Sequence, residues 1–182
     1  MEIKLGTLAF KPARMNPDLL ATAVSAAISK LPTGGEVGVC EIDPTLSDTA
    51  AFCEHYQVTM EQAANCVVLE AKRGDTKQYA ACVILGSTRA DVNGLARRTL
   101  DARRVSFAPM EKAVELTRME YGAITPIALP ADWPILIDKA VVDSGYVIIG
   151  SGIRMSKLAV PGSLLASLPN AHVLEGLGQE KV

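Results

Sequence analysis

The chain has 182 residues, of which 49% are hydrophobic and 21% charged, and its formal net charge is −2. A chain of this length buries one substantial core and is short for two, so we expect a single domain spanning residues 1–182. The near balance of charge provides no general attraction to a polyanion or an acidic membrane, so any contact with nucleic acid has to be local.

The N-terminal segment MEIKLGTLAF lacks the charged start and long apolar centre of a secretion signal. No later stretch approaches the roughly 18 apolar residues that span a bilayer, so we expect a soluble, cytoplasmic protein without membrane contacts. The four cysteines stand singly, and neither CxxC nor a paired-histidine spacing occurs. We therefore expect reduced core thiols and no metal site or cofactor, and we place the isolated His55 and His172 at the surface.

The first predicted element is an amphipathic helix that begins at Asn16-Pro17, an N-cap followed by proline at the first helical position. Pro32 and Gly34-Gly35 end this helix. The apolar residues at helical spacing are Leu19, Leu20, Val24, Ile28 and Leu31.

Three short elements are predicted next. Residues 37–42 form an apolar strand, and residues 48–56 form a short helix. Thr59-Met60-Glu61-Gln62 has the pattern of a capping box, which opens one more helical turn.

A β-hairpin is predicted from the apolar runs 66–71 and 80–85, which flank the charged stretch 72–77. Asp91 caps a helix that continues through Leu100, residues 105–107 are extended, and Pro109 opens another helix to about Arg118.

The last third of the chain begins with a loop punctuated by glycine and proline. Strands are predicted at 135–137 and 146–149, an extended segment at 157–160, a helix at 161–168 and a frayed tail. Strands thus occur both as adjacent hairpins and between helices. This predicts a mixed α/β (α+β) fold, with helices packed on a mixed sheet rather than a regular βαβ array.

Two glycine-bearing loops are candidate sites. Segment 121–130, YGAITPIALP, is either a turn before a strand or a loop in which Gly122 admits a ligand to the backbone and Pro126 stiffens the chain. Segment 150–157, GSGIRMSK, lacks the spacing of a phosphate-binding loop, and a tight hairpin turn is its favoured interpretation. Arg154 and Lys157 would be its functional side chains.

Basic residues gather at Arg97, Arg98, Arg103 and Arg104, with Lys112 and Arg118 beyond them. Acidic residues interleave with them, so we expect an ion-paired, solvated helix face, with a phosphate-contacting patch as the alternative. No histidine stands near a serine or cysteine in a nucleophile elbow, and no pair of carboxylates stands out for acid–base chemistry. The residues alone predict no reaction.

Three stretches, taken in order, carry a resemblance to a known family. They are AANCVVLEA at residues 63–71, GAITP at 122–126 with the downstream Ile137-Asp138, and the strand and turn VIIGSG at 147–152. Together they resemble the YbaK/EbsC family and the related insertion domain of bacterial prolyl-tRNA synthetases. The similarity extends from about residue 47 to 175.

The resemblance implies a compact α/β fold with a mixed, partly barrel-like sheet surrounded by helices. It also implies an activity, the hydrolysis of the ester that joins a wrong amino acid to the 3′ adenosine of a tRNA. The implied partners are the aminoacyl end of tRNA and an aminoacyl-tRNA synthetase that delivers it.

The site residues implied by the resemblance fall on the two loops and on the start of the first hairpin strand. Asn65, Gly122 and Lys157 are the candidate catalytic residues. The candidate substrate-binding residues are Ala123, Ile124, Thr125, Pro126, Ser151, Gly152 and Arg154.

Asn65 stands where these relatives have a lysine. A lysine ammonium can stabilise the negative charge that develops on the ester carbonyl oxygen, whereas asparagine offers only a neutral hydrogen-bond donor. Lys72 is seven residues further on, about 23 Å along a strand and on its opposite face. Lys157 is therefore the expected substitute.

Three functional hypotheses remain open from the sequence. The first is a trans-editing deacylase for mischarged tRNA. The second is a binding module that keeps the pocket for an aminoacyl end, an amino acid or a protein partner without catalysis. The third is recruitment of the fold for an unrelated small ligand.

Overall fold

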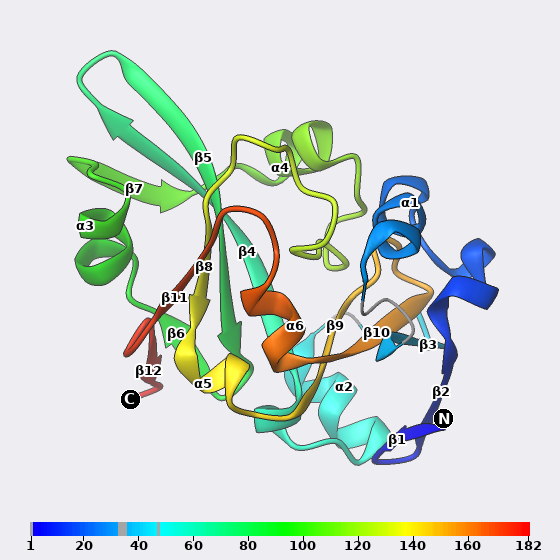
Figure 1. Cartoon of the computed structure of the whole chain (residues 1–182). Helices are drawn as coiled ribbons and strands as arrows, with labels where there is room; N and C mark the ends of the chain where they lie inside the picture. The colour runs from blue at the N-terminus through cyan, green and yellow to red at the C-terminus, as the bar shows by residue number, and fades with distance from the viewer. Residues whose placement is uncertain (1, 33–35, 47) are drawn as a thin grey trace.

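Two five-stranded β-sheets form the centre of the computed structural model, which describes residues 2–32, 36–46 and 48–182 (Figure 1). The first sheet is antiparallel, in the order β1 (Ile3–Leu5), β2 (Leu8–Pro12), β3 (Gly38–Glu41), β10 (Ser156–Pro161) and β9 (Tyr146–Gly150). The second has the order β11 (Ala171–Leu174), β8 (Ile135–Asp138), β5 (Thr76–Leu85), β4 (Ala64–Arg73) and β7 (Arg104–Phe107). A small antiparallel pair joins β6 (Thr88–Ala90) to β12 (Gly178–Glu180).

The second sheet is mixed, because β11, β8 and β5 run parallel while β5, β4 and β7 run antiparallel. An isolated parallel bridge between Ala63 and Ile148 brings the start of β4 to β9 of the first sheet. The sheets thus curl into a half-barrel, and the predicted mixed, partly barrel-like fold is confirmed. Apolar residues of both sheets, such as Val83, Ile137, Ile149 and Leu158, share one core cluster.

Helices surround this half-barrel (Figure 1). The α-helices are α1 (Thr22–Lys30), α2 (Thr49–Tyr56), α3 (Arg97–Thr99), α4 (Met110–Thr117), α5 (Lys139–Val142) and α6 (Gly162–Ala166). Short 3-10 turns are η1 (Ala13–Met15), η2 (Pro17–Leu19) and η4 (Met60–Gln62), and a π turn, η5 (Val92–Ala96), leads into α3.

The predicted hairpin is confirmed and is longer than expected. β4 and β5 pair from Ala64 opposite Leu85 to Arg73 opposite Thr76, and Gly74 turns the chain with φ +60°. The charged residues expected in the turn belong to the strands, because Lys72 and Lys77 lie opposite each other and both form ion pairs with Glu70.

The caps predicted at Thr59 and Asp91 are confirmed, and Asp48 provides a further cap at the start of the predicted helix 48–56. The Asp48 carboxylate accepts a hydrogen bond from the backbone N–H of Ala51 at the start of α2, and Asp91 accepts from Gly94 and Leu95 at η5. The Thr59 capping box is present at η4. These local signals define where the elements that flank the strands begin.

The helix predicted to begin at Asn16-Pro17 is wrong in its first turns. Pro17 opens only the 3-10 turn η2, the chain is extended at Leu20, and α1 begins at Thr22. The Asn16 side chain donates back to the carbonyl of Pro12, and the N–H of Ala21 donates to the carbonyl of Ser151. These contacts draw the segment toward the β9–β10 loop instead of into a helix. Gly34-Gly35, predicted to end the helix, lie outside the described residues.

The frayed tail is a second wrong prediction, because β11 pairs with β8 and β12 pairs with β6. The strands β1 and β2 were not predicted either. All four strands are short. β1 pairs only with its neighbour β2, whereas β2, β11 and β12 acquire partners from more distant parts of the chain, which local sequence patterns do not reveal.

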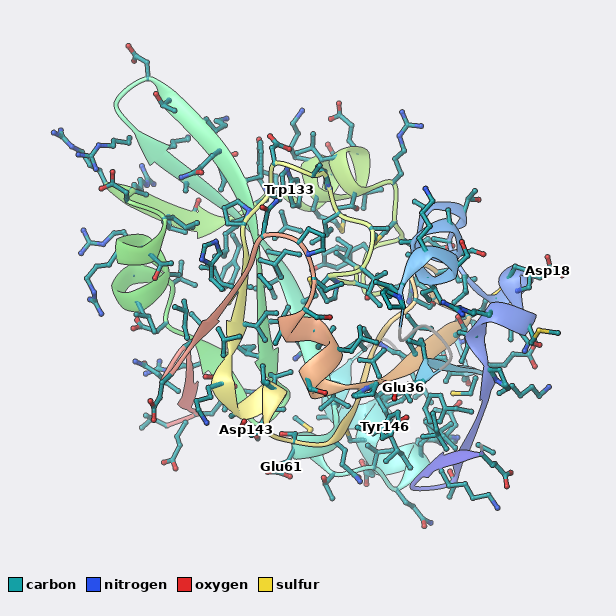
Figure 2. The ribbon with its side chains drawn as sticks, viewed as in Figure 1. Asp18, Glu36, Glu61, Trp133, Asp143 and Tyr146 are labelled. Atoms are coloured by element: carbon teal, nitrogen blue, oxygen red, sulfur yellow. The ribbon has the colours of Figure 1, made fainter. Side chains whose placement is uncertain are left out.

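Two polar or aromatic contacts tie the outer elements to the core (Figure 2). The Tyr146 hydroxyl donates to the backbone carbonyl of Glu36 over 3.2 Å, which joins β9 to the segment before β3. The buried Trp133 stacks on Tyr79 with ring centroids 5.8 Å apart. Cys40, Cys53 and Cys82 are buried and His55 and His172 are exposed, as predicted, whereas Cys66 is only partly buried.

Candidate functional site

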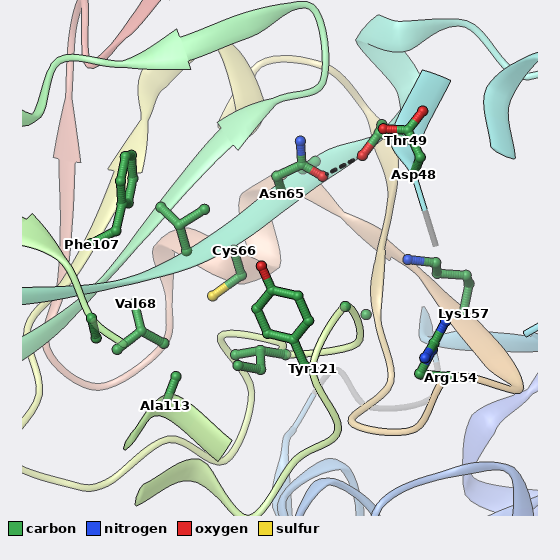
Figure 3. Close-up of a pocket in the computed structure, with 16 residues that line it drawn as sticks. Asp48, Thr49, Asn65, Cys66, Val68, Phe107, Ala113, Tyr121, Arg154 and Lys157 are labelled. Carbon is green, nitrogen blue, oxygen red and sulfur yellow. Dashed lines mark hydrogen bonds between the residues drawn. The ribbon is translucent and has the colours of Figure 1, made fainter. Parts of the chain in front are cut away.

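A cavity of about 730 Å³ is lined by residues of both sheets (Figure 3). Its walls come from the start of β4, the end of β7, the facing ends of β9 and β10, the N-terminus of α2, and α4 with the loop after it. The lining residues are Asp48, Thr49, Ala64, Asn65, Cys66, Val67, Val68, Phe107, Ala108, Ala113, Tyr121, Gly122, Ile124, Gly150, Arg154 and Lys157. The volume is in the usual range for a small-molecule site.

One wall of the cavity is an unpaired edge of β4. β7 pairs with residues 69–72 of β4, and the last bond along this edge runs from the N–H of Ala108 to the carbonyl of Val68. Backbone groups alternate between the two sides of a strand, so Cys66 also directs its N–H and C=O to this edge. The edge therefore presents a backbone donor and acceptor to the cavity.

Asn65 is held at this wall by a side chain of α2. The Thr49 hydroxyl donates to Asn65 Oδ1 over 2.9 Å (Figure 3). The Asn65 side chain is thus not spent on capping its own strand. Among the described residues, its Nδ2 group makes no hydrogen bond within the protein, so both N–H donors are available for a ligand.

Lys157 lies at the far end of the cavity from Phe107 (Figure 3). It is half-buried on β10, between Cys40 of β3 and Gly150 of β9, and its Nζ lies 5.5 Å from the centroid of the Phe52 ring. Within the described part of the chain no carboxylate forms an ion pair with it. Burial lowers the pKa of Lys157, and burial raises the pKa of its neighbour Cys40 to about 12. The cavity therefore contains a partly desolvated cation that forms no ion pair among the described residues, although the Asp48 carboxylate also lines the cavity.

The two glycine-bearing loops of the sequence lie against each other. The N–H of Gly152 donates to the carbonyl of Ala123 over 2.8 Å, and a Cβ atom at Gly150 would overlap that same carbonyl. Gly122 has φ +86°, a conformation that favours glycine. Close backbone contact between the loops thus requires the glycines and fixes the position of residues 122–124 at the cavity.

The structure separates the predicted site residues into two groups. Asn65, Gly122, Ile124, Arg154 and Lys157 line the main cavity. Ala123 lines only a narrow extension of about 10 Å³ beside it. Thr125, Pro126, Ser151 and Gly152 are buried and do not line the main cavity.

The buried members of the loops stabilise the loops from inside. The Ser151 hydroxyl donates to the carbonyl of Ile153 over 2.9 Å, and the N–H of Thr125 donates to the Met119 sulfur. Thr125 Oγ1 is buried without a hydrogen-bond partner in the described part of the chain. Arg154 reaches from its loop to the carbonyl of Pro44 over 3.0 Å.

Several lining residues were not predicted from the sequence. Asp48 and Thr49 were recognised only as the start of a helix, and Phe107 only as the end of a short extended segment. Phe107 and Tyr121 are 61% and 59% exposed although both border the cavity. An aromatic residue directly before the glycine of GAITP was the one local signal for Tyr121.

Covalent catalysis by a side chain has little support in the cavity. Burial raises the pKa of the Cys66 thiol, which keeps it protonated and weakly nucleophilic. Neither histidine lines the cavity, so no imidazole is available there as a base.

Within residues 2–32, 36–46 and 48–182, no cluster of three metal-ligating side chains occurs. Among the helices of these described residues, none combines the length and the apolar character that crossing a membrane requires.

Solved structures with the same fold include two that match most of the chain. A "putative trans-editing enzyme for prolyl tRNA synthetase" has 20% identity and a TM-score of 0.71, and the match covers 88% of this chain and 96% of that one. The hypothetical protein APE2540 has 19% identity and a TM-score of 0.68, with 78% and 90% covered. At these identities the likeness shows the fold.

No curated protein matches the sequence. The sequence model of the aminoacyl-tRNA editing domain, however, matches residues 43–168. This range contains the whole wall of the cavity, from Asp48 to Lys157. The strands and helix before it complete the first sheet and its core. The chain therefore belongs to the aminoacyl-tRNA editing domain family.

Proposed function

We propose that the protein is a trans-editing deacylase, which hydrolyses the ester between a wrong amino acid and the 3′ end of a tRNA. The observation that carries this proposal is the meeting of Asn65 and Lys157 in one cavity with the loop at Gly122. A donor amide, a cation and a fixed backbone loop are the groups that an ester carbonyl and its developing charge require.

The chemistry follows from the polarity of these groups. A water molecule adds to the ester carbonyl carbon, the carbonyl oxygen becomes negatively charged, and the bond to the ribose oxygen then breaks. The products are the free amino acid and a tRNA with a free terminal hydroxyl. The proton lost by the water moves to the departing ribose oxygen, with the neighbouring ribose hydroxyl as its carrier.

We assign Asn65 Nδ2 to the ester carbonyl and Lys157 Nζ to the negative charge that forms on it. Lys157 thereby takes the place of the lysine that relatives carry at the position of Asn65. An ammonium group in a partly desolvated site interacts more strongly with a developing anion than it does in water. Its lowered pKa and the lack of an ion pair among the described residues support this role.

We assign the remaining predicted residues to the shape of the pocket. Ile124 and the backbone of Gly122 border the amino acid side chain, and Arg154 borders the opposite rim. Ala123, Thr125, Pro126, Ser151 and Gly152 hold this loop in place from behind. We further propose that the protein acts in the cytoplasm on tRNA released by a synthetase. The fold shared with a protein described as a trans-editing enzyme for prolyl-tRNA synthetase makes that synthetase the first partner to test.

The test is a panel of mischarged tRNAs, with loss of the amino acid followed over time. We expect the wild type to release at least one amino acid and Asn65→Ala to lower the rate about 10²–10³-fold, the usual cost of one oxyanion donor. Lys157→Ala should lower it similarly. If Lys157→Ala left the rate unchanged, the assignment of the cation to Lys157 would be wrong.

A second candidate function is a binding module without catalysis. The uncharged side chain of Asn65, at the position where a catalytic cation is expected, favours this candidate. In that case the wild type hydrolyses no member of the panel, and Asn65→Lys creates turnover because it adds the cation at the strand. Turnover by the wild type that Asn65→Ala removes would contradict the binding module.

A further inference from the structure

β7 is an edge strand of its sheet (Figure 1). It connects the cavity to a basic surface. Its last residue, Phe107, lines the cavity, and its first, Arg104, lies opposite Lys72 on β4. The two ends are three positions apart in the sequence, about 10 Å along a strand. Arg103, Arg104, Ser106 and Phe107 are all exposed. One solvent-facing edge thus leads from the cavity to the basic surface.

We define this basic surface by residues 70–77 of the β4–β5 hairpin and residues 97–104 of α3 and the segment before β7. The two segments lie together, since the N–H of Arg103 donates to the carbonyl of Lys72 and Gln78 donates to the carbonyl of Leu100. They carry seven of the lysines and arginines and only three carboxylates, in a chain whose net charge is −2. The positive charge of the protein is therefore concentrated here.

The carboxylates of the basic surface leave four of its five arginines without an ion pair among the described residues. Glu70 forms ion pairs with Lys72 and Lys77, and Asp101 forms one with Arg73. No ion pair involves Arg97, Arg98, Arg103 or Arg104 in the described part of the chain. The expected ion-paired helix face is therefore wrong for these four residues, although Lys112 does pair with Glu115.

We propose that β7 and the basic surface bind the single-stranded 3′ end of an RNA, with a base stacked on Phe107 and phosphates on Arg103 and Arg104. This inference rests on the proposed deacylase function, which puts the last nucleotide in the cavity. Aromatic stacking and cations that follow the backbone are the two components by which proteins bind single strands without reading sequence. Both occur along this edge, with Phe107 at the cavity, Arg104 at the other end of β7 and Arg103 directly before it. Arg104 and Phe107 project from opposite faces of the sheet, so the strand of RNA would cross the exposed edge between them.

A charged edge strand also protects a sheet from pairing with another molecule, and this is the competing explanation for the arginines. Protection of the edge explains the charge on β7, but it does not explain an exposed aromatic residue at the cavity. It also predicts no effect of the arginines on RNA affinity. Measurements of RNA binding therefore separate the two explanations.

The test uses the full chain and a fluorescent RNA hairpin with a single-stranded 3′ extension, with anisotropy measured at several salt concentrations. We compare Arg103→Ala/Arg104→Ala with Lys11→Ala/Arg89→Ala, which removes the same charge from exposed positions on β2 and β6. The β7 pair should weaken binding about tenfold or more. It should also lower the salt slope by about 1.4, since each single-strand phosphate contact contributes about 0.7.

Stacking is tested with Phe107→Ala, which should weaken binding about fivefold or more. Met110→Ala is its control, because Met110 is 53% exposed nearby but does not line the cavity. Equal losses in the β7 variants and in their controls, at unchanged melting temperature, would overturn the proposal. So would wild-type affinity in both β7 variants.

Hydrolysis assays keep this proposal distinct from the proposed function. For Arg103→Ala/Arg104→Ala we expect a higher KM on mischarged tRNA and an unchanged rate on aminoacyl-adenosine, which has no strand to bind. Active wild type with an unchanged KM in the variant would refute only the RNA surface. RNA binding that depends on β7, without hydrolysis of any substrate, would refute only the deacylase.

Discussion

The Thr49 hydroxyl lies 2.9 Å from Asn65 Oδ1 and donates a hydrogen bond to it, which ties the first residue of α2 to the start of β4. The bond uses the acceptor of the amide and leaves its two Nδ2 donors without a hydrogen-bond partner among the described residues. An amide oriented in this way loses less entropy when it meets an ester carbonyl, because its rotamer is already set.

Thr49→Val should therefore slow deacylation without removing any group that touches substrate. We expect kcat to fall about 3- to 10-fold, the equivalent of one net hydrogen bond, with KM nearly unchanged. Steady-state kinetics on a tRNA that the wild type deacylates provide the measurement. Thr49→Ser, which keeps the hydroxyl, is the control and should retain wild-type kinetics. A Thr49→Val enzyme as active as the wild type would show that Asn65 needs no support.

Lys157→Met should stabilise the protein while it abolishes most of the activity. The ammonium is partly desolvated beside Phe52 and Cys40, and methionine has a similar length without the charge. Stabilising substitutions of this kind commonly raise the free energy of unfolding by about 0.5–2 kcal/mol. Urea denaturation measures the change, and Lys11→Met at an exposed site is the control. Loss of stability in Lys157→Met would mean that interactions with neighbouring groups outweigh the desolvation cost of the Lys157 ammonium in the folded protein.

The lowered pKa of Lys157 predicts two pH dependences. Catalysis that needs the ammonium should decline as pH rises through a value below the ordinary 10.5, once the uncatalysed ester hydrolysis is subtracted. The unfolded state holds the proton more tightly in that window, so the free energy of unfolding should rise with pH there. Lys157→Met should show neither change. A rate that keeps rising to pH 10.5 would contradict the role of the charge.

Gly150→Ala should displace the loop at Gly122, because the added methyl group would overlap the carbonyl of Ala123. Overpacking of this kind typically costs about 1–3 kcal/mol, and we expect activity to fall more than stability alone explains. Gly74→Ala is a suitable control, since its φ of +60° makes alanine costly but no atom lies near. It should lose stability, measured by urea denaturation, and keep full deacylation. Equal activity losses in both variants would argue against a special role for the loop contact.

The sequence by itself determined the elements whose causes are local. Thr59 and Asp91 cap their turns as predicted, because a capping side chain bonds to N–H groups within four residues of itself. The β4–β5 hairpin follows from two apolar runs joined by a tight turn. The resemblance in residues 63–71, 122–126 and 147–152 was sufficient for the family and its fold.

Only the tertiary structure decided which residues share the cavity. Asn65 and Lys157 belong to different sheets and meet because the bridge between Ala63 and Ile148 curls the two sheets together. The short pairing of β7 leaves the edge of β4 open at Cys66, and this depends on where a distant strand ends. Such contacts join segments far apart in the chain, so no local pattern encodes them. The same reason explains why β11, β12 and the position of Phe107 at the cavity were not foreseen.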